Sequence, residues 1–407
     1  MANTGFDQKQ RFTLASIAQN RNFLGLLIAN TVLGAAFPIQ LILGGLTGLM
    51  LAPNPALATL PSSMQTLAGL VAAAPFSLLM GRIGRRAGFA IGALMTISGA
   101  LAATHALYSG SFALLCAGHF VMGAGWAAFQ YFRFAAGEVV DTTLRPVAIS
   151  LMLTSLLVAA IVGPQVFIAA KDALAPVPFA GAYAAIAAVA VLGVMPLAVV
   201  RMPLPARAPA SDTANRFAVL GALRRRPVQR AIGIGAVSQG VMVFLMIPTP
   251  IAMIECGFSE TTASDVVRWH IVAMFAPSFF TGFLIVRFGI QTIATVGLLT
   301  IISAAGVAAW GISAAHFYGA LIVLGVGWNF SFIGATTMLA AAVSEAEKAA
   351  VQGANDTIIA LVSTVCAFAA GFVLLSLGWA ILAALSGVIV LLVLVWLAFD
   401  RSPLPSG

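Results

Sequence analysis

Charged side chains are scarce in this sequence. Of its 407 residues only 8% are Asp, Glu, Lys or Arg and 61% are hydrophobic, whereas an ordinary soluble domain is roughly 25% charged. A soluble fold of this size cannot hide so much apolar surface, which excludes the soluble enzymes and soluble binding domains. Long apolar runs are instead typical of helices that cross a bilayer, because each crossing needs about 20 apolar residues.

Lysine and cysteine are also nearly absent. The only lysines are Lys9, Lys171 and Lys348, and no GxxxxGK[ST] phosphate loop occurs, which argues against ATP-driven pumping. The three cysteines lack paired spacing, so no disulfide framework is expected. No nucleophile–base pair or pair of intramembrane carboxylates supports catalysis, and we predict no enzyme activity. A non-transporting assembly factor for an oxidase stays open as an alternative.

Gly, Pro and charge clusters divide the apolar sequence into about twelve predicted transmembrane helices. We place them near residues 23–50, 56–80, 87–108, 111–135, 144–170, 178–200, 229–255, 264–286, 289–311, 316–342, 351–375 and 378–398. The predicted fold class is therefore an all-α membrane protein. It has an N-terminal six-helix bundle (1–200), a central cytoplasmic loop (201–228) and a C-terminal six-helix bundle (229–407).

The basic residues predict the orientation of these helices. Lys171 and Arg268 fall on one face of the membrane, and the other eighteen of the twenty Lys and Arg fall on the face that holds both termini and the central loop. By the positive-inside rule both termini are cytoplasmic. The net charge of +8 is thereby explained without a nucleic-acid partner, and membrane lipid is the expected surrounding.

The two halves repeat short motifs in the same order. Residues 123–126 (GAGW) correspond to 325–328 (GVGW), and 82–84 (RIG) correspond to 287–289 (RFG), at offsets of 202 and 205 residues. With these repeats the whole chain resembles the major facilitator superfamily, which implies transport by alternating access between two six-helix halves. Arg82 and Arg287 are predicted to have gating or structural roles in the loops after helices two and eight. The acidic residue usual in that loop is absent, because Gly81 and Val286 stand in its place.

Two motifs with four-residue spacing predict a soft metal site. Met242 and Met246 lie one turn apart on helix seven, as His270 and Met274 do on helix eight. Three thioethers and an imidazole suit Cu(I) better than the oxygen-preferring Mg²⁺, Ca²⁺ or Mn²⁺. The alternative is plain packing, because methionine commonly fills gaps between helices.

The pair of motifs resembles the CcoA-type copper importers, a branch of the superfamily that supplies copper for cytochrome cbb3 oxidase assembly in bacteria. The resemblance implies copper as the transported substrate, with no resident cofactor, a multi-pass location in the bacterial inner membrane, and a possible cytoplasmic copper acceptor. Residues 274–282 also resemble a wider branch that includes riboflavin transporters. An importer of riboflavin or another organic solute therefore stays open, with four residues as its sensitive set: Trp126, Tyr131, Trp328 and Asn329.

Each of the other metal or thiol candidates has a structural alternative, which is packing or an inert thiol. Cys116, His119 and Met122 follow one another at three-residue intervals on helix four, as a second ligand cluster or as packing around a satisfied histidine. Cys256 either receives Cu(I) or is an inert thiol at the outer interface. Cys366 faces the transport cavity or packs within helix eleven.

Three further residues are candidates for gating or structure. Asp356 is predicted to cap the start of helix eleven, where a carboxylate is favoured by the helix dipole, or to act in gating with an arginine of the inner face. Pro248 and Pro250 lack backbone donors. They are predicted to kink helix seven just outside Met246, which would let the ligand-bearing half of that helix move.

Overall fold

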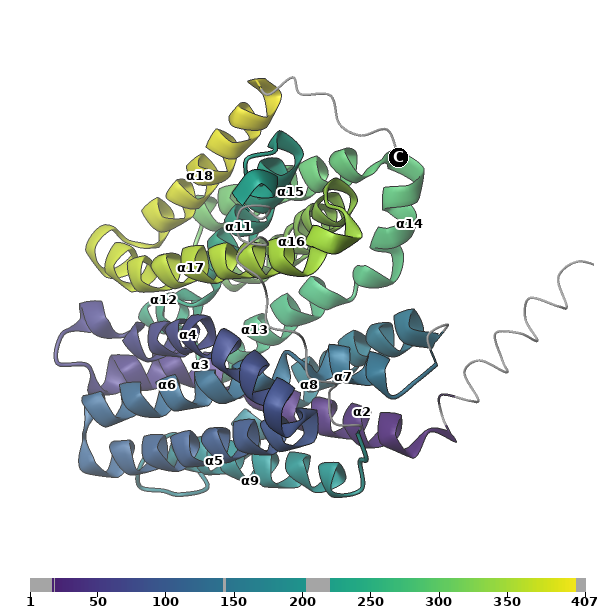
Figure 1. The fold of residues 1–407 in the computed structure, drawn as a ribbon. Helices are drawn as coiled ribbons and strands as arrows, with labels where there is room; N and C mark the ends of the chain where they lie inside the picture. The colour runs from purple at the N-terminus through teal and green to yellow at the C-terminus, as the bar shows by residue number, and fades with distance from the viewer. Residues whose placement is uncertain (1–16, 18, 142–143, 203–219, 400–407) are drawn as a thin grey trace, which may run out of the picture. The chain divides into compact units, whose positions relative to one another are not determined.

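A computed structural model describes residues 17, 19–141, 144–202 and 220–399 (Figure 1). Residues 203–219, which make up most of the predicted central loop, lie outside the described residues. Residues 1–16 also lie outside them. The regular elements within the described ranges are all helical. They are α2 (Arg21–Gly34), α3 (Ala36–Leu51), η1 (Pro55–Leu57), α4 (Leu60–Ile83), α5 (Arg85–Ser109), α6 (Phe112–Phe129), α7 (Phe132–Glu138), α8 (Arg145–Ala170), α9 (Ala180–Val194), η3 (Met195–Ala198), α11 (Arg226–Met246), α12 (Thr249–Glu255), α13 (Glu260–Phe275), α14 (Ser278–Phe288), α15 (Ile290–Trp310), α16 (Ala314–Ala342), α17 (Glu345–Leu377) and α18 (Trp379–Phe399).

The predicted fold class is confirmed. Among the described residues, eleven helical spans are long and apolar enough to cross a membrane. A twelfth is obtained when α13 and α14, bent by 41° at their junction, are taken as one span. Each predicted helix has a counterpart at its place in the chain.

Several spans are interrupted rather than continuous. The predicted eighth helix is broken at Ala276 and Pro277 between α13 and α14, and the seventh is broken at Ile247 and Pro248 between α11 and α12. Proline removes the N–H that would continue the helical hydrogen bonding. The break after Met246 therefore falls where the two prolines predicted a kink.

The chain forms two compact units. One comprises Met1–Gln40 and Val71–Ala208, and the other comprises Leu41–Leu70 and Pro209–Gly407. Residues 41–70, the end of α3 through the start of α4, thus group with the second unit. The division into halves at 201–228 rests on the long polar stretch between the sixth and seventh predicted helices and stays a prediction.

Each unit contains a pair of neighbouring helices packed through glycine at repeat-related positions. In the first unit α5 and α6 lie side by side, and a Cβ added to Gly125 would lie 2.5 Å from the carbonyl oxygen of Gly92 (Figure 1). In the second unit α15 and α16 lie side by side, and a Cβ added to Gly327 would lie 2.9 Å from the carbonyl oxygen of Gly297. Small residues allow this approach of backbones in membrane helices, and the same contact occurs at repeat-related positions.

A second repeated feature joins successive helices. Gly84, between α4 and α5, has φ 88° and ψ 158°, and Gly289, between α14 and α15, has φ 87° and ψ 149°. This conformation is essentially restricted to glycine. The RIG and RFG motifs therefore build the same tight connection in both units.

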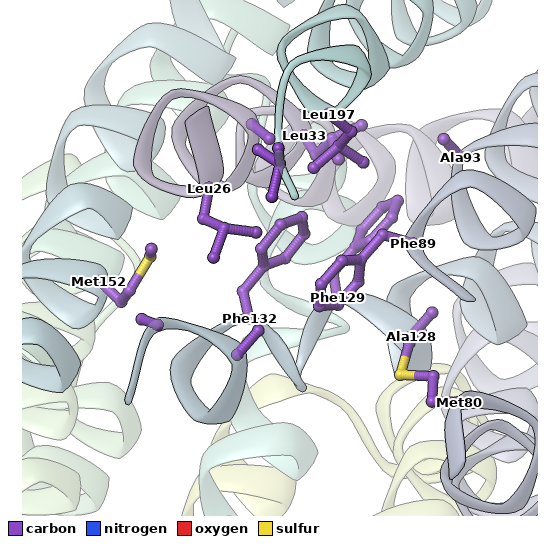
Figure 2. Close-up of a cluster of buried hydrophobic side chains, with 14 of the residues drawn as sticks. Leu26, Leu33, Met80, Phe89, Ala93, Ala128, Phe129, Phe132, Met152 and Leu197 are labelled. Atoms are coloured by element: carbon purple, nitrogen blue, oxygen red, sulfur yellow. The ribbon is translucent and has the colours of Figure 1, made fainter. Parts of the chain in front are cut away.

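The core of the first unit is built on aromatic rings from two consecutive helices and α5. Phe89 and Phe132 stack with ring centroids 3.9 Å apart, and Phe129 packs 6.1 Å from Phe132. Figure 2 shows these rings with Leu26 and Met152 in the same buried cluster. The cluster ties α2, α5, α6, α7 and α8 together within this unit.

The glycine contact predicts a clear difference between two substitutions in α15. We expect Gly297→Ala to destabilise the protein by about 1–3 kcal/mol, because the new methyl group overpacks against α16. Its Cβ would lie 2.8 Å from the carbonyl oxygen of Gly327. Gly306→Ala is the matched control, since nothing lies within 4 Å of its added Cβ. Thermal unfolding in detergent measures both, and equal stability of the two variants would contradict the packing argument.

Candidate functional site

The predicted HxxxM motif lies on α13 against α16. His270 is fully buried, and its Nδ1 lies 2.7 Å from the carbonyl oxygen of Leu321. A carbonyl oxygen only accepts, so Nδ1 carries the hydrogen of the neutral ring and Nε2 carries the lone pair. Nε2 is buried without a hydrogen-bond partner in the described part of the chain. This tautomer is the one that metal-ligating histidines adopt.

The predicted MxxxM motif lies on α11, with Met242 and Met246 both buried. Both α11 and α13 pack against α16, whereas α11 and α13 are not among the closely packed helix pairs of the described residues. The two helices that carry the motifs thus share α16 as a neighbour. Convergence of their four donor atoms on one ion stays a prediction.

A metal site built from His, Cys, Asp and Glu finds no support in the described part of the chain. Within residues 17, 19–141, 144–202 and 220–399, no group of three or more His, Cys, Asp or Glu side chains is placed to hold a metal ion.

Aromatic side chains gather around Trp328 of α16. Its ring stacks on Phe332 at 4.9 Å with an interplanar angle of 16°, and Phe275 of α13 meets it edge-on at 6.1 Å. Its indole Nε1 donates to Oε1 of Gln239 on α11, 2.7 Å away. Three helices of the second unit thus supply one aromatic and amide cluster. We call Gln239, Phe275, Trp328 and Phe332 the Trp328 cluster.

The prediction from sequence missed Gln239. The available signal was an amide inside an otherwise apolar spanning helix, where a polar side chain is costly unless it has a use. Gln239 precedes Met242 by three residues, so the two lie on one face of α11. The MxxxM motif therefore borders the Trp328 cluster.

Asn329 has a different role from its neighbour Trp328. Its Nδ2 donates to the carbonyl oxygen of Met274 (2.7 Å) and to Ser278 Oγ (2.6 Å), and its Oδ1 accepts from Thr281 Oγ1 (2.7 Å). The side chain is 1% exposed. The nitrogen and the oxygen of its amide both bond residues at the break between α13 and α14. Asn329 therefore positions this bend and is not placed to contact a solute. Thr281 is the one buried residue of α14.

The first unit carries the repeat-related tryptophan. Trp126 of α6 stacks on Phe37 of α3 at 4.4 Å and 18°. Tyr131 follows α6, and its hydroxyl donates to the carbonyl oxygen of Ala73 at 2.9 Å. Each unit thus presents one tryptophan stacked on a phenylalanine at the position that the GxGW repeat predicts.

The candidates on α6 have different neighbours. His119 is fully buried with its Nε2 2.6 Å from the hydroxyl of Tyr183 on α9. Met122 packs against Gly99 of α5, and Cys116 is a buried free thiol. The contacts favour packing around a satisfied histidine over a second ligand cluster.

The other cysteines also lie apart. Cys256 is exposed at the end of α12. Cys366 is half-buried on α17, and its Sγ would be 3.1 Å from a Cβ added to Gly240 of α11. Cys366 therefore packs in the seam between α11 and α17.

The predicted gating arginines are exposed, in the last turns of α4 and α14. Among the described residues, neither Arg82 nor Arg287 forms an ion pair. The neighbouring Arg85 instead forms a two-pronged bond to Glu138, with a shortest distance of 2.6 Å. This ion pair joins the start of α5 to the end of α7.

The prediction that Asp356 caps a helix is wrong. α17 begins at Glu345, and Asp356 lies well inside it. Ser344 is the N-cap, in a capping box with Glu347, whose carboxylate also pairs with Arg225 at 2.9 Å. The Ser-x-x-Glu spacing is a known start signal for a helix.

The capping box predicts a pH effect outside the membrane spans. Hydrogen bonds from Ser344, with the Arg225 charge, lower the pKa of Glu347 from 4.5 to about 2. Because the folded pKa is depressed, the stabilisation is complete above pH 4.5 and is lost as the pH falls toward 2. We expect Glu347→Gln to lower the melting temperature at pH 7, and the gap to wild type to close over that acid range. A constant gap down to pH 2.5 would contradict this account.

The Asn329 contacts predict a stability difference between two amides. Asn329→Leu should cost about 1–3 kcal/mol, because the groups it bonds at the α13–α14 break lose a buried partner. Asn355→Leu is the control, since that amide donates to the exposed Asp356 at 3.1 Å, and we expect a change within about 0.5 kcal/mol. Unfolding in denaturant with detergent measures both. A neutral Asn329→Leu would show that the bend does not depend on this network.

Repeat-related sets of apolar helices that are long enough to cross a bilayer define a multi-pass membrane protein with an internal repeat. The sequence profile of the Major Facilitator Superfamily matches residues 22–363, and the chain belongs to this superfamily of secondary transporters.

Relatives and solved structures agree with this family. The chain is 38% identical over 389 residues to the riboflavin transporter RfnT of Brucella anthropi, covering 95% of this chain and 97% of that protein. Its fold is similar to the nucleoside transporter NupG (TM-score 0.72, 13% identity, 93% and 100% covered). It is also similar to a bacterial homologue of the human lysosomal transporter Spinster (TM-score 0.71, 14% identity, 95% and 99% covered). At these identities the two structures show the fold alone.

Proposed function

We propose that this protein imports riboflavin, or a solute of the same planar heteroaromatic class, by alternating access. The observation that carries the proposal is the 38% identity over nearly the full length of both chains to a riboflavin transporter. The resemblance of residues 274–282 to the branch that includes riboflavin transporters agrees with it. The relative favours this cargo over copper.

The Trp328 cluster supplies chemistry that suits such a cargo. Stacked indole and phenyl rings are flat and apolar, and aromatic pairs gain about 0.5–1.5 kcal/mol beyond the area they bury. Trp126 on Phe37 offers a second flat surface in the other unit. A planar ring system is the solute shape that these surfaces bind best.

The predicted orientation places both termini and the central loop on the cytoplasmic side. Eighteen basic residues on one face predict cytoplasmic termini in the bacterial inner membrane. A neutral solute gains nothing from the membrane potential, so net uptake is driven by its own gradient, by trapping in the cytoplasm or by a co-transported ion.

The direct test is uptake of radiolabelled riboflavin by cells that lack their own riboflavin uptake. Wild type should accumulate it, and Trp328→Ala should raise KM by roughly 2- to 10-fold through the lost stacking. Trp126→Ala and Tyr131→Ala test the first unit. Trp310→Ala is the control, because Trp310 is 87% exposed at the end of α15. If cells that express the wild-type protein accumulate no riboflavin, the proposal is refuted.

Import of Cu(I) is the second candidate, and the unpaired Nε2 of buried His270 is the observation that favours it. Alanine variants at Met242, Met246, His270 and Met274 should then lose uptake of labelled copper, while Met338→Ala, a buried methionine outside both motifs, should keep it. Normal copper accumulation by all four variants at normal protein levels would remove the metal site.

A further inference from the structure

The amide of Gln239 has a defined orientation. An indole N–H can only donate, so the 2.7 Å contact with Trp328 Nε1 identifies the Gln239 atom as the carbonyl oxygen Oε1. The NH₂ group therefore points away from the indole nitrogen. The stack of Trp328 on Phe332 holds the indole, and through it the amide.

The NH₂ group of Gln239 is free to bind something else. Gln239 is half-buried on α11, and no hydrogen bond from its Nε2 is found among the described residues. Nε2 is also not one of the buried unpaired atoms of the described residues, so it is accessible at the surface of the second unit. Exposure of two donors to lipid would be costly, and polar groups within spans face water-filled pathways or partners. A solute that passes through the protein is one such partner for Nε2.

We propose that Gln239 determines specificity by donating from Nε2 to a carbonyl oxygen or ring nitrogen at the rim of a planar heteroaromatic solute that packs against Trp328 and Phe332. This inference rests on the proposed function and names the solute atoms that Gln239 recognises. The stacked rings bind any flat apolar molecule, whereas a fixed NH₂ group at their edge accepts only those that bring an acceptor. Riboflavin has such acceptors on its ring, at the dione edge. A flat hydrocarbon offers none and would leave the NH₂ group unpaired.

The test is riboflavin uptake into vesicles that contain the purified full-length protein. Gln239→Glu keeps an oxygen for the Trp328 N–H and replaces the NH₂ donor with a second acceptor, and we expect KM to rise about tenfold or more. Trp328→Phe keeps a ring but removes the N–H that orients the amide, and we expect a smaller rise. Gln291→Glu makes the same chemical change at an exposed position of α15 and should leave KM unchanged. Melting temperatures establish that each variant is folded.

Competition by lumiflavin, which carries the same ring without the ribityl chain, identifies the part of the solute that Gln239 reads. Weaker competition in Gln239→Glu, by the same factor as the rise in KM, supports a contact with the ring. Competition equal to wild type would place the contact on the chain and overturn the inference, as would an unchanged KM in a folded Gln239→Glu. Absence of riboflavin uptake by wild type is the separate outcome that refutes the proposed function itself. If Gln239→Glu does not fold, Trp328→Phe decides the matter, and an unchanged KM there overturns the inference.

Discussion

The absence of water inside a bilayer governs where the polar groups of this chain lie. An unpaired donor or acceptor in hydrocarbon costs several kcal/mol, so most polar side chains in the spans are tied to another helix or to their own. His119 bonds Tyr183, and Asn329 bonds three groups at the α13–α14 break. Among the polar atoms of the second unit that have no hydrogen-bond partner in the described part of the chain, Nε2 of Gln239 and Nε2 of His270 are the two on which the proposals rest.

Close backbone contacts supply the rigid frame around these atoms. Lipid tails are as apolar as leucine, so apolar burial does not drive one membrane helix onto another as it does in water. The glycines of α5–α6 and α15–α16 replace that force with extended van der Waals contact. Since α16 is held against α15 in this way and also packs on α11 and α13, it fixes the position of Trp328 for all of its neighbours.

Much of the fold was predictable because its signals are local. The apolar runs gave each span, and the GxGW and RxG repeats marked positions whose backbone contacts recur in both units. The hydrogen bond of His119 to Tyr183 joins residues 64 apart in the chain, and no periodicity reveals it. The role of Asp356 was mispredicted because the eleventh helix was expected to begin near residue 351, whereas α17 begins at Glu345. The Ser344–Glu347 capping box was visible in the sequence and marks the true start of α17.

For the site itself, spacing identified residue types but not their surroundings. Trp328 and Asn329 are adjacent in the chain, yet their surroundings differ. Trp328 lies in an aromatic stack, whereas Asn329 is hydrogen-bonded to a backbone carbonyl and two hydroxyl groups. Met242 and Met246 do lie one turn apart on α11. The polar side chain on the same helical face, Gln239, accepts a hydrogen bond from Trp328, and the spacing alone does not reveal this partner.

The 41° bend between α13 and α14 has a consequence for the surrounding membrane. A bent span projects a shorter length along the bilayer normal than a straight one. A thin bilayer therefore matches the bent form, and a thick bilayer favours straightening through hydrophobic mismatch. Because Thr281 is the one buried residue of α14, the hydrogen bonds of Asn329 are the main contacts that hold the bend against this pressure. Acyl-chain length thereby becomes a variable that acts on the conformation of this span.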